Sequence, residues 1–196
     1  MRTKKKRREY VNRHSLAEHS SRCVHVSCYC YECTLPFEGS PASLVHHLTA
    51  PSVTHYWPAT VNIKYESCFA VPESLEDHRR LLVSEEDSSV FLLIAGTCEA
   101  RTGHRPLSVV CVRGDAADAD TDTRPMYVCV LTVTTPPRYV GGDTGYAKHT
   151  WTLPSWDFPA DVDMERARCY LNPNDVHGDS KEVHLDTCIT KINVDH

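Results

Sequence analysis

The order of apolar and polar residues along the chain predicts a protein built mainly of β-strands. In the segment 61–65, apolar side chains alternate with polar ones, which is typical of a strand with one buried face. Continuous apolar runs follow at 90–95, 107–112 and 126–133, and an alternating segment lies near 183–192. Because no long helical segment separates these strands, the pattern predicts an antiparallel β-sandwich.

One short helix is predicted before the strands. Ser40 can cap a helix, and Pro41 suits its first turn. Apolar residues follow at helical spacing with two adjacent histidines between them, and Pro51 should end the helix. The sequence therefore predicts a helix from about 41 to 49.

Length and composition favour a compact soluble protein. The 196 residues suffice for one domain, or for one domain and a small appendage. Apolar residues make up 41% of the chain, and the mean hydropathy is −0.39. No apolar run reaches the roughly 18 residues that a transmembrane helix needs, and no apolar segment follows the basic residues 1–8 as it would in a secretory signal. We expect a cytosolic or nuclear protein with reduced thiols and no membrane partner.

Charge argues against a general nucleic-acid-binding protein, because the net charge is −5. The basic segment 4–8 could be a nuclear localisation signal or a nucleic-acid patch, although a solvated tail is the simpler interpretation. The polar, acidic segment 115–124 fits an exposed loop, and the glycine-rich segment 141–145 fits a turn. Trp151 and Trp156 could line a peptide groove, but core packing is the favoured interpretation.

The ten cysteines fall into two groups. Four lie within eleven residues, a clustering that favours metal binding over disulfides in a reducing compartment. The other six are scattered, mostly in apolar runs, and are interpreted as small buried apolar residues. The clustered group is Cys23, Cys28, Cys30 and Cys33, and the scattered group is Cys68, Cys98, Cys111, Cys129, Cys169 and Cys188.

Histidines follow the cysteine cluster at a spacing that suits a metal ion. Thirteen residues separate Cys33 from His47, and seven more separate His47 from His55. Thiolate and imidazole ligands of this kind favour tetrahedral zinc, with two ligands from a loop or hairpin and two from the helix region. Such a site contributes folding free energy directly to a segment too small for its own core. The alternative is a cysteine-rich loop without a metal.

These residues resemble the second zinc finger of the seven-in-absentia (Sina-like, SIAH-type) E3 ubiquitin ligases. The resemblance is carried by the segments 28–33, 37–39, 44–48 and 55–58. Upstream, His19 and Cys23 look like the last two ligands of the family's first finger. Downstream, the apolar runs 91–95 and 107–112 look like core strands of its TRAF-like sandwich. The whole resemblance covers roughly residues 14–192.

The resemblance implies that four residues bind one zinc ion, and that Cys30 or His46 could take the place of one of the four. The gap between the cysteine ligands is shorter than in the family. The gap between the histidine ligands is longer, and Pro51 interrupts it, so the second histidine must return from a loop. The implied ligands are Cys28, Cys33, His47 and His55.

The first finger is incomplete. Only His19 and Cys23 match it, and two ligands do not make a structural zinc site. We therefore expect the first site to be empty, or its remnant to be disordered.

The resemblance also implies a domain organisation and a function. Residues 1–13 would form a basic disordered tail, 14–57 a SIAH-type zinc-finger region and 58–196 a TRAF-like sandwich that binds substrates. The family's RING recruits the ubiquitin-loaded E2, and the sequence holds no eight-ligand Cys/His array. We expect the protein to bind protein substrates or peptides by strand addition. We also expect it to pair with itself or with a full-length relative, and not to promote ubiquitin transfer alone.

Two other interpretations remain open. The sequence could come from a truncated gene model of a complete E3 ubiquitin ligase. It could also be a nucleic-acid-binding zinc-finger protein that uses its basic tail, although the negative charge counts against this. No catalytic signature such as a nucleophile elbow or a papain-like cysteine motif is present.

Overall fold

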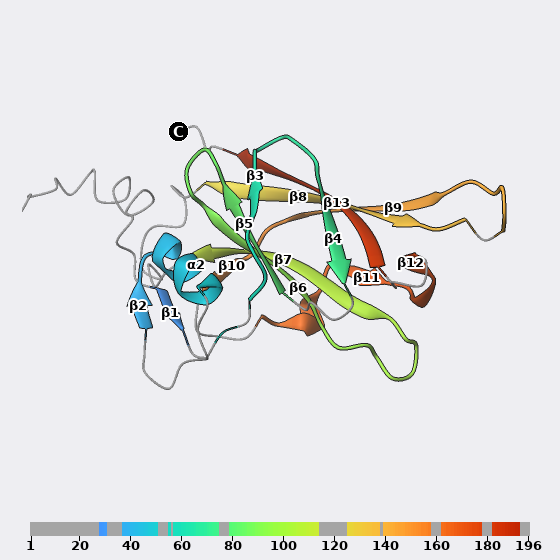
Figure 1. The fold of residues 1–196 in the computed structure, drawn as a ribbon, viewed down its shortest axis with the longest axis horizontal. Helices are drawn as coiled ribbons and strands as arrows, with labels where there is room; N and C mark the ends of the chain where they lie inside the picture. Colours follow the sequence, from blue (N-terminus) through green and yellow to red (C-terminus); the bar gives the residue numbers. More distant parts are fainter. Residues whose placement is uncertain are drawn as a thin grey trace, which may run out of the picture.

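The computed structural model describes residues 28–30, 37–50, 55, 57–74, 79–113, 125–137, 139–157, 162–177 and 182–192. This part of the chain is mainly β and contains one α-helix (Figure 1). Within it, no helix is both long and apolar enough to span a membrane. Its helix and strands are β1 (Cys28–Cys30), β2 (Phe37–Gly39), α2 (Pro41–Thr49), β3 (Val61–Ile63), β4 (Phe69–Ser74), β5 (Arg79–Ser84), β6 (Val90–Ala95), β7 (Arg105–Arg113), β8 (Met126–Thr135), β9 (Gly145–Thr152), β10 (Ser155–Asp157), β11 (Cys169–Leu171), β12 (Val176–His177) and β13 (Glu182–Ile192).

Two sheets pack face to face. A six-stranded sheet has the order β10-β7-β6-β5-β3, with β11 also paired to β7. A five-stranded sheet has the order β12-β13-β8-β9, with β4 also paired to β13. Most neighbouring strands are antiparallel, as the sequence predicts, but β3 runs parallel to β5 and β10 runs parallel to β7. The small β1–β2 hairpin is separate from both sheets.

The main core lies between the two sheets. In β8 the buried and partly buried residues alternate, and β13 shows the same alternation up to Ile189. Their buried side chains meet Phe91 and Leu93 of β6 and the inward residues of β7 in a single apolar cluster. Because residues of both sheets share this cluster, the fold is a β-sandwich.

The six-stranded sheet is buried on both faces. In β6, Phe91 and Leu93 belong to the core between the sheets, whereas Val90 and Leu92 belong to a second cluster on the other face. Leu44 and Leu48 of α2 and Cys30 of β1 complete that second cluster. Figure 1 shows α2, β1 and β2 together beside this sheet, and we call these three elements the cap. Burial on both faces explains why 90–95 is continuously apolar instead of alternating.

The predicted helix matches α2, and its start is capped as expected. The Ser40 Oγ accepts a hydrogen bond from the Ser43 backbone N–H at 3.2 Å. The predicted strand over 61–65 ends earlier, at Ile63, because the chain turns at Glu66, where φ is +61°. Tyr65 still packs against the main core.

The sequence did not predict the strands β4, β5 and β9 or the short strands β10–β12. The glycine-rich segment does form a turn, with Gly141 at a φ of +83° and the Gly142 N–H bonded to the Tyr139 carbonyl at 3.0 Å. Trp151 lies in the main core, as favoured. The side chain of Trp156, the acidic segment 115–124 and the basic tail lie outside the described residues.

The prediction for the scattered cysteines is correct for three and wrong for two. Cys111, Cys129 and Cys169 are buried in the main core. Cys68 and Cys98 are exposed, and Cys188 is partly exposed. The two exposed cysteines precede β4 and follow β6, where the chain lies outside the sheets.

Asp87 is the centre of a polar cluster in the β5–β6 connection. Its carboxylate accepts hydrogen bonds from the Tyr65 hydroxyl at 2.8 Å, the Ser89 backbone N–H at 3.0 Å and the Lys191 Nζ at 2.6 Å. Burial alone would raise the pKa of Asp87, but these bonds from Lys191, Ser89 and Tyr65 lower it to about 2. The cluster ties β13 to the β5–β6 connection.

We predict that Asp87→Asn removes a pH-dependent contribution to stability. Since the pKa of Asp87 is lower in the folded state than its ordinary 3.8, its contribution is present above about pH 4 and is lost as pH falls toward 2. For a partly exposed ion pair we expect about 1 kcal/mol at most. Urea unfolding at pH 7 and pH 3 measures this.

Glu85→Gln is the matched control, because Glu85 contacts Lys64 at 3.5 Å with both side chains largely exposed. The deficit of the Asp87→Asn variant should shrink at pH 3, whereas the Glu85→Gln variant should differ little from wild type at either pH. An Asp87→Asn deficit of equal size at both pH values would contradict the prediction.

Candidate metal centre

The cap brings a β-hairpin and a helix together. Strand β1 pairs antiparallel with β2, which places Cys30 opposite Phe37. The chain then enters α2 directly after β2, with Ser40 as the N-cap. The hairpin and the helix therefore lie side by side. Cys30 is buried in the same apolar cluster as Leu44 and Leu48 of α2.

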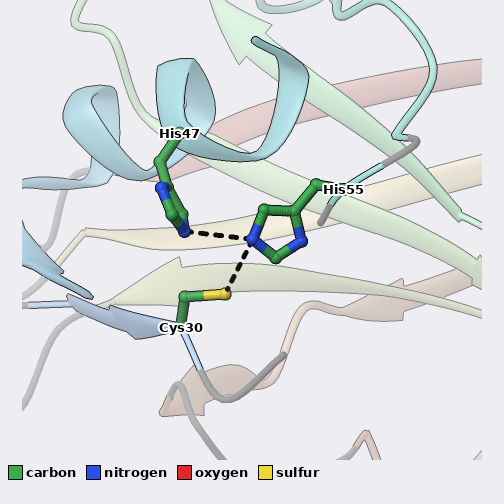
Figure 2. Close-up of side chains that lie close together, drawn as sticks. All are labelled: Cys30, His47 and His55. Atoms are coloured by element: carbon green, nitrogen blue, oxygen red, sulfur yellow. Dashed lines mark hydrogen bonds between the residues drawn. The ribbon is translucent and has the colours of Figure 1, made fainter. Parts of the chain in front are cut away.

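His47 and His55 approach Cys30 from two further directions. His47 lies in the last turn of α2. His55 lies beyond the helix, as the interruption at Pro51 predicts, and its side chain is only 4% exposed. Figure 2 shows the three side chains pointing toward one another from β1, from α2 and from the segment after it.

The donor atoms converge at short range. The His55 Nε2 lies 3.1 Å from the His47 Nε2 and 3.6 Å from the Cys30 Sγ. The ligand atoms of the three residues all lie within 4.8 Å of one another. The rings of His47 and His55 meet edge to face, with centroids 4.7 Å apart.

These distances fit a tetrahedral metal ion. Zinc bonds of about 2.05 Å to nitrogen and about 2.3 Å to sulfur place two tetrahedral nitrogens about 3.3 Å apart, and a nitrogen and a sulfur about 3.6 Å apart. The observed separations of 3.1 Å and 3.6 Å are close to both values. Both separations that involve His55 therefore match a tetrahedral site, and the three donor atoms are close enough to share one ion.

The chemistry of the His55 Nε2 favours the same interpretation. A neutral imidazole nitrogen offers either one proton or one lone pair. This atom faces both the His47 nitrogen and the Cys30 sulfur, so a hydrogen bond can serve only one of them well. A cation between the three atoms would accept a lone pair from each.

The surroundings of His47 favour the form that binds metals. Burial, and to a lesser extent the charge of His55, lowers the pKa of His47. A lowered pKa keeps the imidazole neutral near pH 7, and the neutral ring is the metal ligand.

The structure brings together two of the four implied ligands and one of the substitutes. His47 and His55 meet, and Cys30 joins them. His46 is exposed on α2 and is not part of the group. For Cys28 only the backbone in β1 is described. Cys33, His19 and Cys23 lie outside the described residues.

A spacing signal could have favoured Cys30 as a ligand. Cys30 and Cys33 are separated by two residues, and a Cys-x2-Cys pair is a common zinc-binding spacing. The resemblance instead assigns Cys28, which stands two residues before Cys30 in the same short strand.

Comparisons with known proteins do not add to this assignment. No protein-family model matches the chain, and no curated protein matches it.

We predict that His47→Ala removes metal binding and that His46→Ala does not. The two residues are neighbours on α2, so both variants should change helix propensity equally, but only His47 faces the other donors. Loss of a direct ligand should weaken cobalt or zinc binding by more than about 100-fold, since even outer contacts of a ligand are worth 10–100-fold.

Cobalt titration measures this through the thiolate-to-cobalt absorption band, and a chelating dye competes for zinc. The His46→Ala variant should bind within a factor of about two of wild type. Equal loss in both variants, or no loss in either, would contradict the assignment of the site.

Proposed function

We propose that the chain is a zinc-binding protein-interaction module similar to the substrate-recognition part of Sina-like E3 ubiquitin ligases. The observation that carries the proposal is the convergence of Cys30, His47 and His55 in a cap packed on a β-sandwich. A small Cys/His site followed by a TRAF-like sandwich is the arrangement that the resemblance implies. In this proposal residues 14–57 are the zinc-finger region and 58–196 are the binding domain.

Zinc is the ion that the donor set favours. One thiolate and two imidazoles are soft or borderline ligands, which suit zinc better than calcium or magnesium. We assign Cys33 as the fourth ligand, because its spacing from Cys30 completes a Cys-x2-Cys pair. Four protein ligands leave no open position for water or substrate, so the role of this zinc is structural.

The sandwich offers a place for a partner strand. In the described part of the five-stranded sheet, β9 is an edge strand of eight residues, and most of its side chains are exposed. An edge strand presents unpaired backbone groups to which an extended peptide can add. Figure 1 shows the β8–β9 hairpin extending away from the rest of the sandwich.

Exposed apolar side chains occur along the same hairpin. Tyr139, Val140 and Tyr146 are 73%, 105% and 78% exposed. Large exposed apolar side chains that lie close together are typical of interaction sites. They support a protein or peptide as the partner and make the β8–β9 hairpin the first surface to test.

We predict that Cys33→Ser weakens zinc binding strongly and that Cys28→Ser does not. The variants differ in which cysteine pairs with Cys30, and both exchange a thiol for a hydroxyl of similar size. Zinc per chain, measured after dialysis against a weak chelator, should fall well below one for the Cys33→Ser variant only. Loss in the Cys28→Ser variant alone would restore Cys28 as the ligand in place of Cys33.

Affinity capture tests the proposed function. The zinc-loaded chain should retain protein partners that include a RING-bearing relative, and the Tyr146→Ala variant should retain at least several-fold less of them. Tyr170→Ala is the matched control, because Tyr170 is also exposed, at 48%, but lies in β11 of the other sheet. The chain alone with E1, E2 and ubiquitin should form no ubiquitin conjugates, and addition of the captured relative should restore conjugation.

Three outcomes would contradict this function. Ubiquitin transfer by the chain alone would make it an active ligase. Capture that brings down no protein of the ubiquitin system would remove the proposed family role. Salt-sensitive DNA binding that needs the basic tail would instead support the nucleic-acid interpretation.

A further inference from the structure

Two cysteines distant in the sequence face each other at one end of the β4–β13 ladder. Strands β4 and β13 are antiparallel, and the last residue pair of their ladder is Phe69 with Thr187. One step further along the same register places Cys68 opposite Cys188. Neither cysteine forms a disulfide bond in the structure.

Their side chains share the outer face of the five-stranded sheet. Thr187 and Ile189 are fully buried in the sandwich, and successive side chains of a strand point to opposite faces, so Cys188 between them points outward. Residues directly opposite in an antiparallel pair point to the same face. Cys68 is exposed and Cys188 is partly exposed, and the two thiols lie close enough for Cys68 to affect the pKa of Cys188.

The backbone geometry at this position suits a disulfide. Opposite residues of an antiparallel pair have Cα atoms about 4.5–5.5 Å apart, within the range of about 4.4–6.8 Å that disulfides span. Their Cβ atoms are about 4.5–5.5 Å apart and must come slightly closer. The chain stays beside β13 on both sides of Cys68, because Phe69 pairs with Thr187 and the Glu66 N–H donates to the Ile189 carbonyl at 2.9 Å.

We propose that Cys68 and Cys188 are an oxidation site, which a disulfide oxidant such as glutathione disulfide converts into a cross-strand disulfide bond. This inference goes beyond the proposed function and does not depend on it. The cap packs on the six-stranded sheet, whereas these cysteines lie on the five-stranded sheet.

The reaction balances in two exchange steps. The Cys68 sulfur, after loss of its proton, attacks glutathione disulfide, breaks its S–S bond and releases one glutathione thiolate, which takes up that proton. The Cys188 sulfur then loses its proton, attacks the Cys68 sulfur of the mixed disulfide and releases the second glutathione. Two cysteine thiols are oxidised by two electrons in total, and one glutathione disulfide is reduced to two glutathione molecules.

The surroundings of the two sulfurs set the order of attack. Burial, together with the neighbouring Cys68, raises the pKa of Cys188 to about 11. Cys188 is therefore protonated near pH 7, and it is also less accessible to a bulky oxidant than Cys68. Cys68 is the entry point, and Cys188 closes the bond.

The bond would fix the start of β4 to β13. Among the described strands, β4 of the five-stranded sheet is paired only to β13, and most of the sandwich lies between the two cysteines in the sequence. A cross-link that closes so long a loop restricts the unfolded chain strongly. Oxidation should therefore raise the Tm by about 5 °C or more.

Peptide mapping of the full zinc-loaded chain tests the proposal. After incubation with glutathione disulfide, the intact mass should fall by about 2 Da, and addition of dithiothreitol should reverse the change. Trypsin releases residues 65–79 and 182–191, each with a single cysteine, so an unreduced digest should contain these two peptides linked. The rise in Tm should accompany the linked peptide.

Variants distinguish this site from the other cysteines. Cys68→Ser and Cys188→Ser should abolish the linked peptide and the rise in Tm. Cys98→Ser should change neither, because Cys98 is equally exposed but lies in the β6–β7 connection. Cys68→Ser alters only an exposed side chain before β4, so it keeps the test informative even if Cys188→Ser disturbs the sheet.

Two results would overturn the proposal. One is glutathione attached to Cys68 or Cys188 singly, without any linked peptide in the wild-type chain. The other is a linked peptide between different cysteines that persists in the Cys68→Ser variant together with the rise in Tm. Zinc content, measured in the same samples, shows whether the proposed zinc site fails independently.

Discussion

The apolar outer face of the six-stranded sheet is the constraint on which the arrangement of this protein depends. Leu92 of β6 and Val110 of β7 point away from the main core and are nonetheless buried. Without a second layer they would lie in water, at a cost of roughly 25 cal/mol for each Å² of apolar surface. The cap provides that layer through Leu44 and Leu48, which are among the most buried side chains of the protein.

Few side chains of the cap helix are buried. The helix has nine residues, which is short for an isolated helix in water, and only two of its side chains are buried. The three donor residues link the hairpin, the helix and the segment after it at one point. A metal ion there would stabilise the helix that covers the sheet, so the site and the second apolar cluster support each other. This dependence supports the structural role that we propose for the site.

A strand could be predicted from the sequence where burial of its side chains leaves an apolar pattern. β6 and β8 were predicted because their apolar patterns reflect two buried faces and one buried face respectively. β9 was missed because nearly all of its side chains are exposed, so its sequence carries no alternation. The helix was predicted closely, since Ser40 and Pro41 are local signals. Contacts set by strand register were not predictable, because no local pattern records which residues of distant strands lie opposite each other.

Cysteine illustrates the same limit, because its role here depends on where each thiol lies. Cys30 is buried beside two imidazoles, Cys129 is buried among apolar side chains, and Cys188 lies opposite a second thiol at the surface. The first environment favours a metal-bound thiolate, the second an inert thiol and the third a disulfide. Cys30 packs against the outer face of the six-stranded sheet, whereas Cys188 belongs to the five-stranded sheet, and the two sheets of a sandwich lie about 10 Å apart. Oxidation of the surface pair can therefore lock the five-stranded sheet while the cap stays seated on the other.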